Sequence, residues 1–154
     1  MWIISKVVFV AATTVLLSAT IDSGRAAGWR YFGGEAGLWV DGALNGIAIG
    51  CDAGSLSLRF FGFATRLEAG RSYSVVLTID DTARRFRARV GEARAGAGSG
   101  LTMAVKGPEA ASLIDALRRG RKAEIATPAG RYDLPLSGSS KALDALTQSV
   151  GCPG

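Results

Sequence analysis

Residues able to do chemistry are few in this chain of 154 residues, which contains no histidine. Ser-His-Asp and Cys-His sites, histidine-ligated metals and imidazole pH switches are therefore excluded. A desolvated lysine can activate a serine, and the stretch Ser137-Gly138-Ser139-Ser140-Lys141 invites that interpretation. The helical acyl-transfer motif needs serine and lysine three positions apart, but position 138 is glycine. We expect instead that Ser139 or Ser140 caps a helix.

Carboxylates can act as general acid and base only where two of them converge on one bond. Asp80 and Asp81 are adjacent in an expected turn, where they point apart, whereas Asp41 and Asp52 are isolated. The calcium-loop pattern D-x-[DN]-x-[DN]-G is missing. The sequence therefore predicts no catalytic residues, no metal and no cofactor.

The glycine-rich segment 93–100, ARAGAGSG, is the candidate for a phosphate-binding loop. It matches neither the GxxxxGK[ST] pattern nor the GxGxxG spacing. We interpret it as a flexible connection.

Arginines supply the candidate binding surface, and the formal net charge is +5. The basic runs lie at 84–89 and 118–122. Such runs can bind nucleic acid or anionic headgroups. The alternative is a solvated strand face and a helix C-terminus whose cations favour the macrodipole. The candidate anion-binding residues are Arg84, Arg85, Arg87 and Arg89.

The first 26 residues read as a secretory signal peptide. Lys6 precedes an apolar stretch, Val7 to Ala19, which is shorter than the ~20 residues that a bilayer-spanning helix needs. The small residues Gly24 and Ala26 fit a cleavage site after Ala26. We predict one β-rich domain over 27–154 in the periplasm or secreted, and hence no nucleic-acid partner and no stable transmembrane segment. An uncleaved anchor is the alternative.

The two cysteines, Cys51 and Cys152, are a pair that an oxidising compartment would join. A metal site is the weaker alternative, since the chain has no CxxC motif. We predict a structural disulfide.

Apolar residues alternate with polar ones through most of the chain, which indicates strands. Ser55–Phe60 alternates strictly, and Tyr73–Ile79 pairs through an Asp80–Ala83 turn with a return strand. In that strand Phe86, Ala88 and Val90 share one face, and Arg85, Arg87 and Arg89 share the other.

Helical periodicity occurs late in the chain. It runs from Pro108 to a stop at Gly120, and again from the serine cap to Gly151. The predicted fold is mainly β (α+β): seven to nine strands in an antiparallel, sandwich-like domain with two helices. Aromatic residues near the mature N-terminus form either core or a binding patch, and we favour core: Trp29, Tyr31, Phe32 and Trp39.

The stretch Ala111–Leu146 has the order helix, hairpin and then Leu136-Ser137-Gly138-Ser139-Ser140-Lys141-Ala142-Leu143. This order resembles the invasion-associated locus B type of small exported protein from Gram-negative bacteria. The resemblance implies a periplasmic, non-enzymatic envelope protein with a β-sandwich. No catalytic residues carry over from it.

Our leading hypothesis is an exported, non-enzymatic accessory protein that binds an envelope protein or an anionic envelope component through the arginine face. The second is an inhibitor or immunity-type protein that inserts a loop, such as 93–100, into a hydrolase. The third is a hydrolase with a Ser/Lys or carboxylate site. The sequence predicts no oligomeric state.

Overall fold

Nine strands form one antiparallel sheet in the computed structural model, which describes residues 27–63, 65–91, 100–149 and 151–152. The strands are β1 (Gly28–Phe32), β2 (Glu35–Val40), β3 (Ala43–Asp52), β4 (Ser55–Phe60), β5 (Ser72–Ile79), β6 (Thr82–Gly91), β7 (Gly100–Lys106), β8 (Lys122–Thr127) and β9 (Gly130–Pro135). Their order across the sheet is β1-β2-β3-β4-β7-β6-β5-β8-β9. Two helices, α1 (Gly107–Arg119) and α2 (Ser139–Thr147), complete the fold. The predicted mainly β class with two late helices is confirmed.

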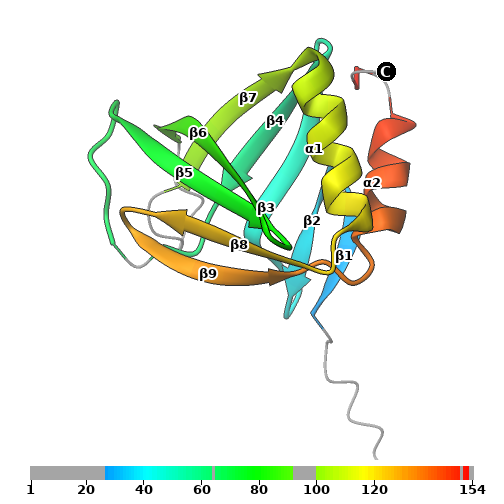
Figure 1. The fold of residues 1–154 in the computed structure, drawn as a ribbon, viewed down its shortest axis with the longest axis horizontal. Helices are drawn as coiled ribbons and strands as arrows, with labels where there is room; N and C mark the ends of the chain where they lie inside the picture. The colour runs from blue at the N-terminus through cyan, green and yellow to red at the C-terminus, as the bar shows by residue number, and fades with distance from the viewer. Residues whose placement is uncertain (1–26, 64, 92–99, 150, 153–154) are drawn as a thin grey trace, which may run out of the picture.

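The strands belong to one continuous sheet, and this sheet bends back on itself (Figure 1). The β5–β6 and β8–β9 hairpins cross over the part of the sheet that contains β3. The Tyr132 hydroxyl on β9 donates a hydrogen bond to the Gly46 carbonyl on β3. Burial raises the pKa of this phenol, so it stays protonated as a donor. The sandwich-like character therefore comes from folding of one sheet.

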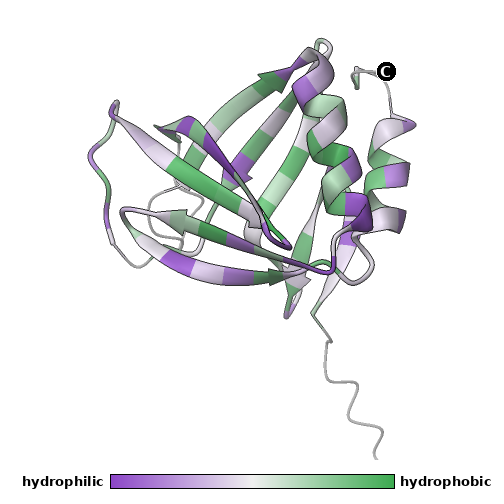
Figure 2. Ribbon diagram, viewed as in Figure 1, coloured by the Kyte–Doolittle hydropathy of each residue, from purple (hydrophilic) through white to green (hydrophobic). Residues whose placement is uncertain are grey.

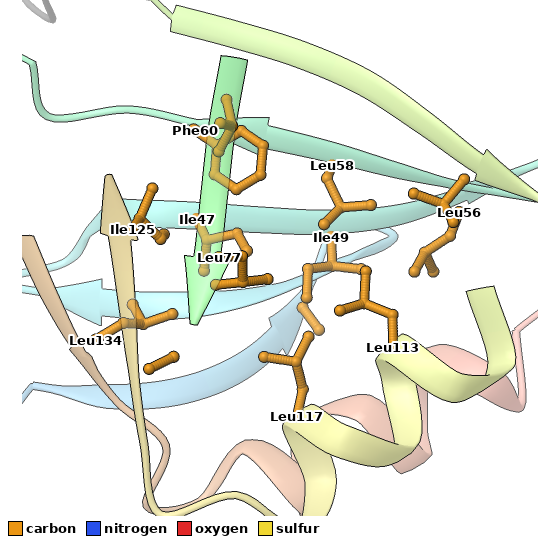
Figure 3. Close-up of a cluster of buried hydrophobic side chains, with 14 of the residues drawn as sticks. Ile47, Ile49, Leu56, Leu58, Phe60, Leu77, Leu113, Leu117, Ile125 and Leu134 are labelled. Carbon is orange, nitrogen blue, oxygen red and sulfur yellow. The ribbon is translucent and has the colours of Figure 1, made fainter. Parts of the chain in front are cut away.

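Alternation of side chains explains why this sheet has a core. Hydrophobic residues alternate with hydrophilic ones along the strands (Figure 2), and successive strand side chains point to opposite faces. Leu113 and Leu117 of α1 pack against this inner face (Figure 3). Full burial of one such side chain is worth about 1.5–3 kcal/mol. The largest side chains with almost no exposure are Ile47, Ile49, Leu56, Leu58, Phe60, Leu77, Leu101, Leu113, Leu117, Ile125, Leu134 and Leu143.

Helix α1 begins and ends where its residues predict. Pro108 and Glu109 lie in its first turn, and the helix ends before Gly120. Gly120 is not in the left-handed conformation of a common helix stop, because its φ is −67°. A Cβ atom there would lie 2.7 Å from both Ile79 and Leu136. Close packing, not backbone conformation, requires this glycine.

Helix α2 starts differently from the prediction. Gly138 occupies the N-cap position with φ 85° and provides no side-chain cap. Ser139 is the first helical residue, and its buried hydroxyl donates to the Leu117 carbonyl at 2.7 Å. The serine cap was therefore wrong: this hydroxyl ties α2 to the end of α1. The helix ends at Thr147, earlier than Gly151.

Candidate functional site

The two cysteines tie the end of the described chain to the sheet. Cys51 on β3 and Cys152 beyond α2 are joined as a disulfide, with Cα atoms 4.7 Å apart. A backbone hydrogen bond of 3.0 Å from the Gly54 N–H to the Gly151 carbonyl runs beside them. The pair closes a loop with a sequence separation of 101.

Three arginines on β6 form the arginine row, which we define as Arg85, Arg87 and Arg89. All three are exposed, and they alternate with the buried residues Phe86 and Ala88. Side chains two positions apart on a strand lie about 6.5 Å apart on one face. Packing of Phe86 and Ala88 in the core thus fixes the arginine row on the outer face of the sheet.

The strands beside β6 place hydroxyl-bearing residues next to Arg87 and Arg89, whereas Arg85 pairs with Val76. Arg89 lies between Ser72 of β5 and Thr102 of β7, while Arg87 pairs with Ser74. Among the described residues, none of the three arginines has an acidic partner within ion-pair distance. Within the described part of the chain, no carboxylate competes with a ligand for these guanidinium groups.

Arg84 does not belong to this surface, which corrects the sequence prediction. It lies on the same side of β6 as Phe86, and it is half-buried. Its guanidinium donates a 2.9 Å hydrogen bond to the Ser112 hydroxyl on α1. Since strand side chains alternate, residues 84 and 85 could not both face a single partner. Arg84 instead connects β6 to the helix.

Strand register adds Arg59 to the outer face. Arg59 of β4 pairs with Thr102 of β7, which in turn pairs with Arg89. Its guanidinium forms an ion pair with Glu35 and lies 5.6 Å from the centre of the Phe61 ring. Alternation alone places Arg59 outward, but only strand order brings it near Arg89. This pairing partly neutralises the charge of Arg59, in contrast to the arginine row.

The N-terminal aromatics divide between core and surface. Trp29 is buried, with 8% of its surface exposed, as favoured from the sequence. Tyr31 and Phe32 are 36% and 71% exposed, so the core interpretation was wrong for them. Trp39 is half-buried, and its ring meets Phe32 edge-on with centroids 5.9 Å apart. The alternation of β1 could have signalled that Trp29 and Phe32 face opposite sides.

The Ser/Lys stretch supplies structure at its centre. The Ser139 hydroxyl is buried against Leu117, whereas Ser137, Ser140 and Lys141 are exposed. Across the described part of the chain, no three Cys, Asp or Glu side chains gather into a metal-binding group.

Asp80 has a structural role that sequence reasoning missed. Its carboxylate accepts hydrogen bonds from the backbone N–H groups of Arg121 at 3.1 Å and Lys122 at 3.3 Å. These backbone hydrogen bonds lower the pKa of Asp80 below its usual value. The β5–β6 turn is thereby tied to the start of β8.

Two predicted features lie outside the described residues: the signal peptide over 1–26 and residues 93–99 of the glycine-rich segment 93–100. Neither of the helices that the structure describes is long and apolar enough to span a bilayer.

Fold and surface together define a mainly β domain with two helices and a row of exposed arginines. No protein-family model matches the chain, and a comparison with curated proteins finds no match. Among solved structures, the chain is similar to invasion associated protein B from Bartonella henselae, with 18% identity and a TM-score of 0.44. The match covers 67% of this chain and 74% of the other. The resemblance predicted from the C-terminal stretch is thus found as a weak structural resemblance.

Proposed function

We propose that this chain is an exported, non-enzymatic accessory protein of the bacterial cell envelope. Its arginine row binds an anionic envelope component or an acidic envelope protein. The observation that carries the proposal is the presence of three exposed guanidinium groups on one rigid strand, without acidic partners among the described residues.

Arginine suits this role better than lysine would. Its planar guanidinium can donate two parallel hydrogen bonds to one phosphate or carboxylate. A strand with a buried opposite face holds the three groups at a fixed spacing, so less conformational entropy is lost on binding. Because the groups are exposed, added salt should weaken the interaction.

Export is supported by the predicted leader over 1–26 and by the cysteine pair, since disulfides persist in oxidising compartments. A non-enzymatic role is supported by Ser139, the central serine of the Ser/Lys stretch, because its hydroxyl is engaged with Leu117. Broad substrate screening tests this part, with Lys141→Ala as the control. Activity that disappears in that variant would overturn it.

Binding is tested with the triple variant Arg85→Ser, Arg87→Ser and Arg89→Ser. The purified protein is mixed with isolated envelope fractions and with vesicles of phosphatidylglycerol or phosphatidylcholine, and sedimentation measures retention. We expect the triple variant to lose at least tenfold in apparent affinity for the envelope fractions. Wild-type retention should fall as salt rises.

The matched control removes three other exposed cations near the C-terminal end of α1: Arg119→Ser, Arg121→Ser and Lys122→Ser. Its net charge equals that of the test variant, but the arginine row is intact, so it should retain near wild-type binding. Equal losses in both variants would show a general charge effect. Either that result or salt-insensitive retention of the test variant removes the proposed surface. Binding to phosphatidylglycerol vesicles identifies a lipid source, whereas binding to envelope fractions alone indicates a protein or glycan.

A further inference from the structure

Strand β1 lies at one end of the sheet, and β2 is its single neighbour among the described strands. It pairs with β2 through a two-residue turn in which Gly33 and Gly34 have φ values of 62° and 85°. Such a turn makes its closing pair, Phe32 and Glu35, a hydrogen-bonded pair. Because these pairs alternate along an antiparallel ladder, the peptide groups of Trp29 and Tyr31 point away from β2. No described strand pairs with that side of β1.

The two end strands of the sheet differ in how well they are protected. β9 has the exposed charged residues Arg131 and Asp133 and ends in Pro135, features that discourage pairing with another chain. β1 instead exposes Tyr31 and Phe32, the exposed large hydrophobic residues of the described chain. β1 has one exposed charge, Arg30, but it contains no proline and its other exposed residues are aromatic, so its edge is the better template for strand addition.

Two hollows lie along β1. One, of about 360 Å³, is lined by Arg30, Tyr31, Phe32, Trp39 and Gly42. The other, of about 310 Å³, lies between β1 and α2 and is lined by Trp29, Arg30, Tyr31, Lys141, Ala142 and Ala145.

Arg30 and Tyr31 line both hollows, which therefore adjoin at the middle of β1. Phe32 in the first hollow and Trp29 in the second come from opposite faces of the strand, because strand side chains alternate. The residues that line the two hollows include two cationic side chains, Arg30 and Lys141, and no carboxylate.

We propose that β1 binds an extended segment of a partner protein, which adds to the sheet as a further strand. Its main chain bonds the outward peptide groups of β1, and side chains from both of its faces enter the two hollows, because the hollows lie on opposite faces of β1. The segment has at least one apolar residue on each face and an acidic residue that meets Arg30 or Lys141. Addition of an extended peptide to a sheet edge, with pockets for alternate side chains, is a recurring mode of recognition. This surface is separate from the arginine row.

Tyr31 is the position where the main chain can be tested. Tyr31→Pro removes the outward N–H, and an edge strand tolerates proline where its N–H faces solvent. Tyr31→Val keeps the N–H and the strand preference while removing the ring. Circular dichroism verifies that both variants are folded.

The probe is a library of random nonapeptides displayed on phage and selected on the purified protein. We expect enrichment of sequences that place an apolar residue on each face of the extended peptide and carry at least one acid. Synthetic peptides with the selected sequences should bind the Tyr31→Pro variant at least tenfold more weakly than the Tyr31→Val variant. Arg30→Glu should lower the affinity for acidic peptides. On binding, the Tyr31 amide should gain hydrogen-exchange protection, whereas the Arg30 amide, which already faces β2, should not.

Selection without enrichment, or peptides that bind Tyr31→Pro and Tyr31→Val equally, would overturn the proposal. So would an unprotected Tyr31 amide in the complex. Light scattering supplies the remaining outcome: a dimer of this chain that Tyr31→Pro converts to monomer means that a second copy, not a partner peptide, occupies the edge. Loss of envelope binding by the arginine-row variant does not bear on these results, since that variant should bind the peptides normally.

Discussion

The indole Nε1 of Trp29 donates a 2.7 Å hydrogen bond to the Pro135 carbonyl, across 106 positions of sequence. Trp29 belongs to β1 and Pro135 to β9, the two end strands of the nine-stranded sheet. The curved sheet therefore brings its ends together at one point, through a side chain instead of a backbone ladder. The rest of the β1 edge stays unpaired with any strand that the structure describes.

Replacing Trp29 with Phe should destabilise the protein. The change deletes the N–H and with it the bond to the Pro135 carbonyl, and a typical hydrogen bond contributes about 0.5–1.5 kcal/mol. Urea unfolding measures the loss. Trp39→Phe is the matched control, because the buried Trp39 indole N–H has no acceptor among the described residues. Equal destabilisation by both variants would contradict a specific role for the Trp29–Pro135 bond.

Ser139→Ala should destabilise the protein by about 1 kcal/mol, because it removes a buried hydrogen bond to the Leu117 carbonyl. Ser140→Ala, one position later and exposed, should change stability by less than about 0.5 kcal/mol. Thermal or urea unfolding of the two variants makes the comparison. A larger effect at Ser140 would favour the N-cap role that the sequence predicted.

Removal of the disulfide by Cys51→Ser with Cys152→Ser should lower the free energy of unfolding by up to about 4–5 kcal/mol, because the closed loop is long. Urea unfolding with and without reductant measures the effect. Reductant should move the wild-type curve toward that of the double variant and leave the double variant unchanged. A wild-type curve that ignores reductant, with two thiols detected by mass spectrometry, would mean that the pair is not oxidised.

Asp80 should make stability depend on pH. Its pKa is lowered in the folded state, so its stabilising contribution is fully present above the ordinary value of 3.8 and disappears as pH falls through the lowered pKa. Asp80→Asn keeps a residue suited to the turn but removes the charge. The urea midpoint of the wild type should exceed that of Asp80→Asn at pH 7, and the difference should shrink below pH 4. Asp81→Asn, an exposed neighbour, should show no comparable change in that difference.

The alternating pattern of β6 contained enough information to predict the arginine row. Phe86 and Ala88 must face a core, so Arg85, Arg87 and Arg89 must face away from it. The same rule assigns Arg84 to the inner side, although the run of basic residues had grouped it with the others. Periodicity also predicted the buried face of α1, with Leu113 and Leu117.

Strand order could not be predicted in the same way. Period-two alternation states which side a residue faces, but it does not state which strand lies alongside. The position of β7 between β4 and β6 brings Thr102 between Arg59 and Arg89, from segments far apart in the sequence.

The sequence by itself determined that this protein is mainly β and that one face of each strand is apolar. Both features follow from alternation and helical periodicity, which are local properties of the chain. Tertiary structure alone decided the Trp29–Pro135 closure, the buried bond of Ser139 and the position of β1 at one end of the sheet. These features depend on which distant segments meet when the sheet curves around one core, and that choice is made by packing of the whole chain.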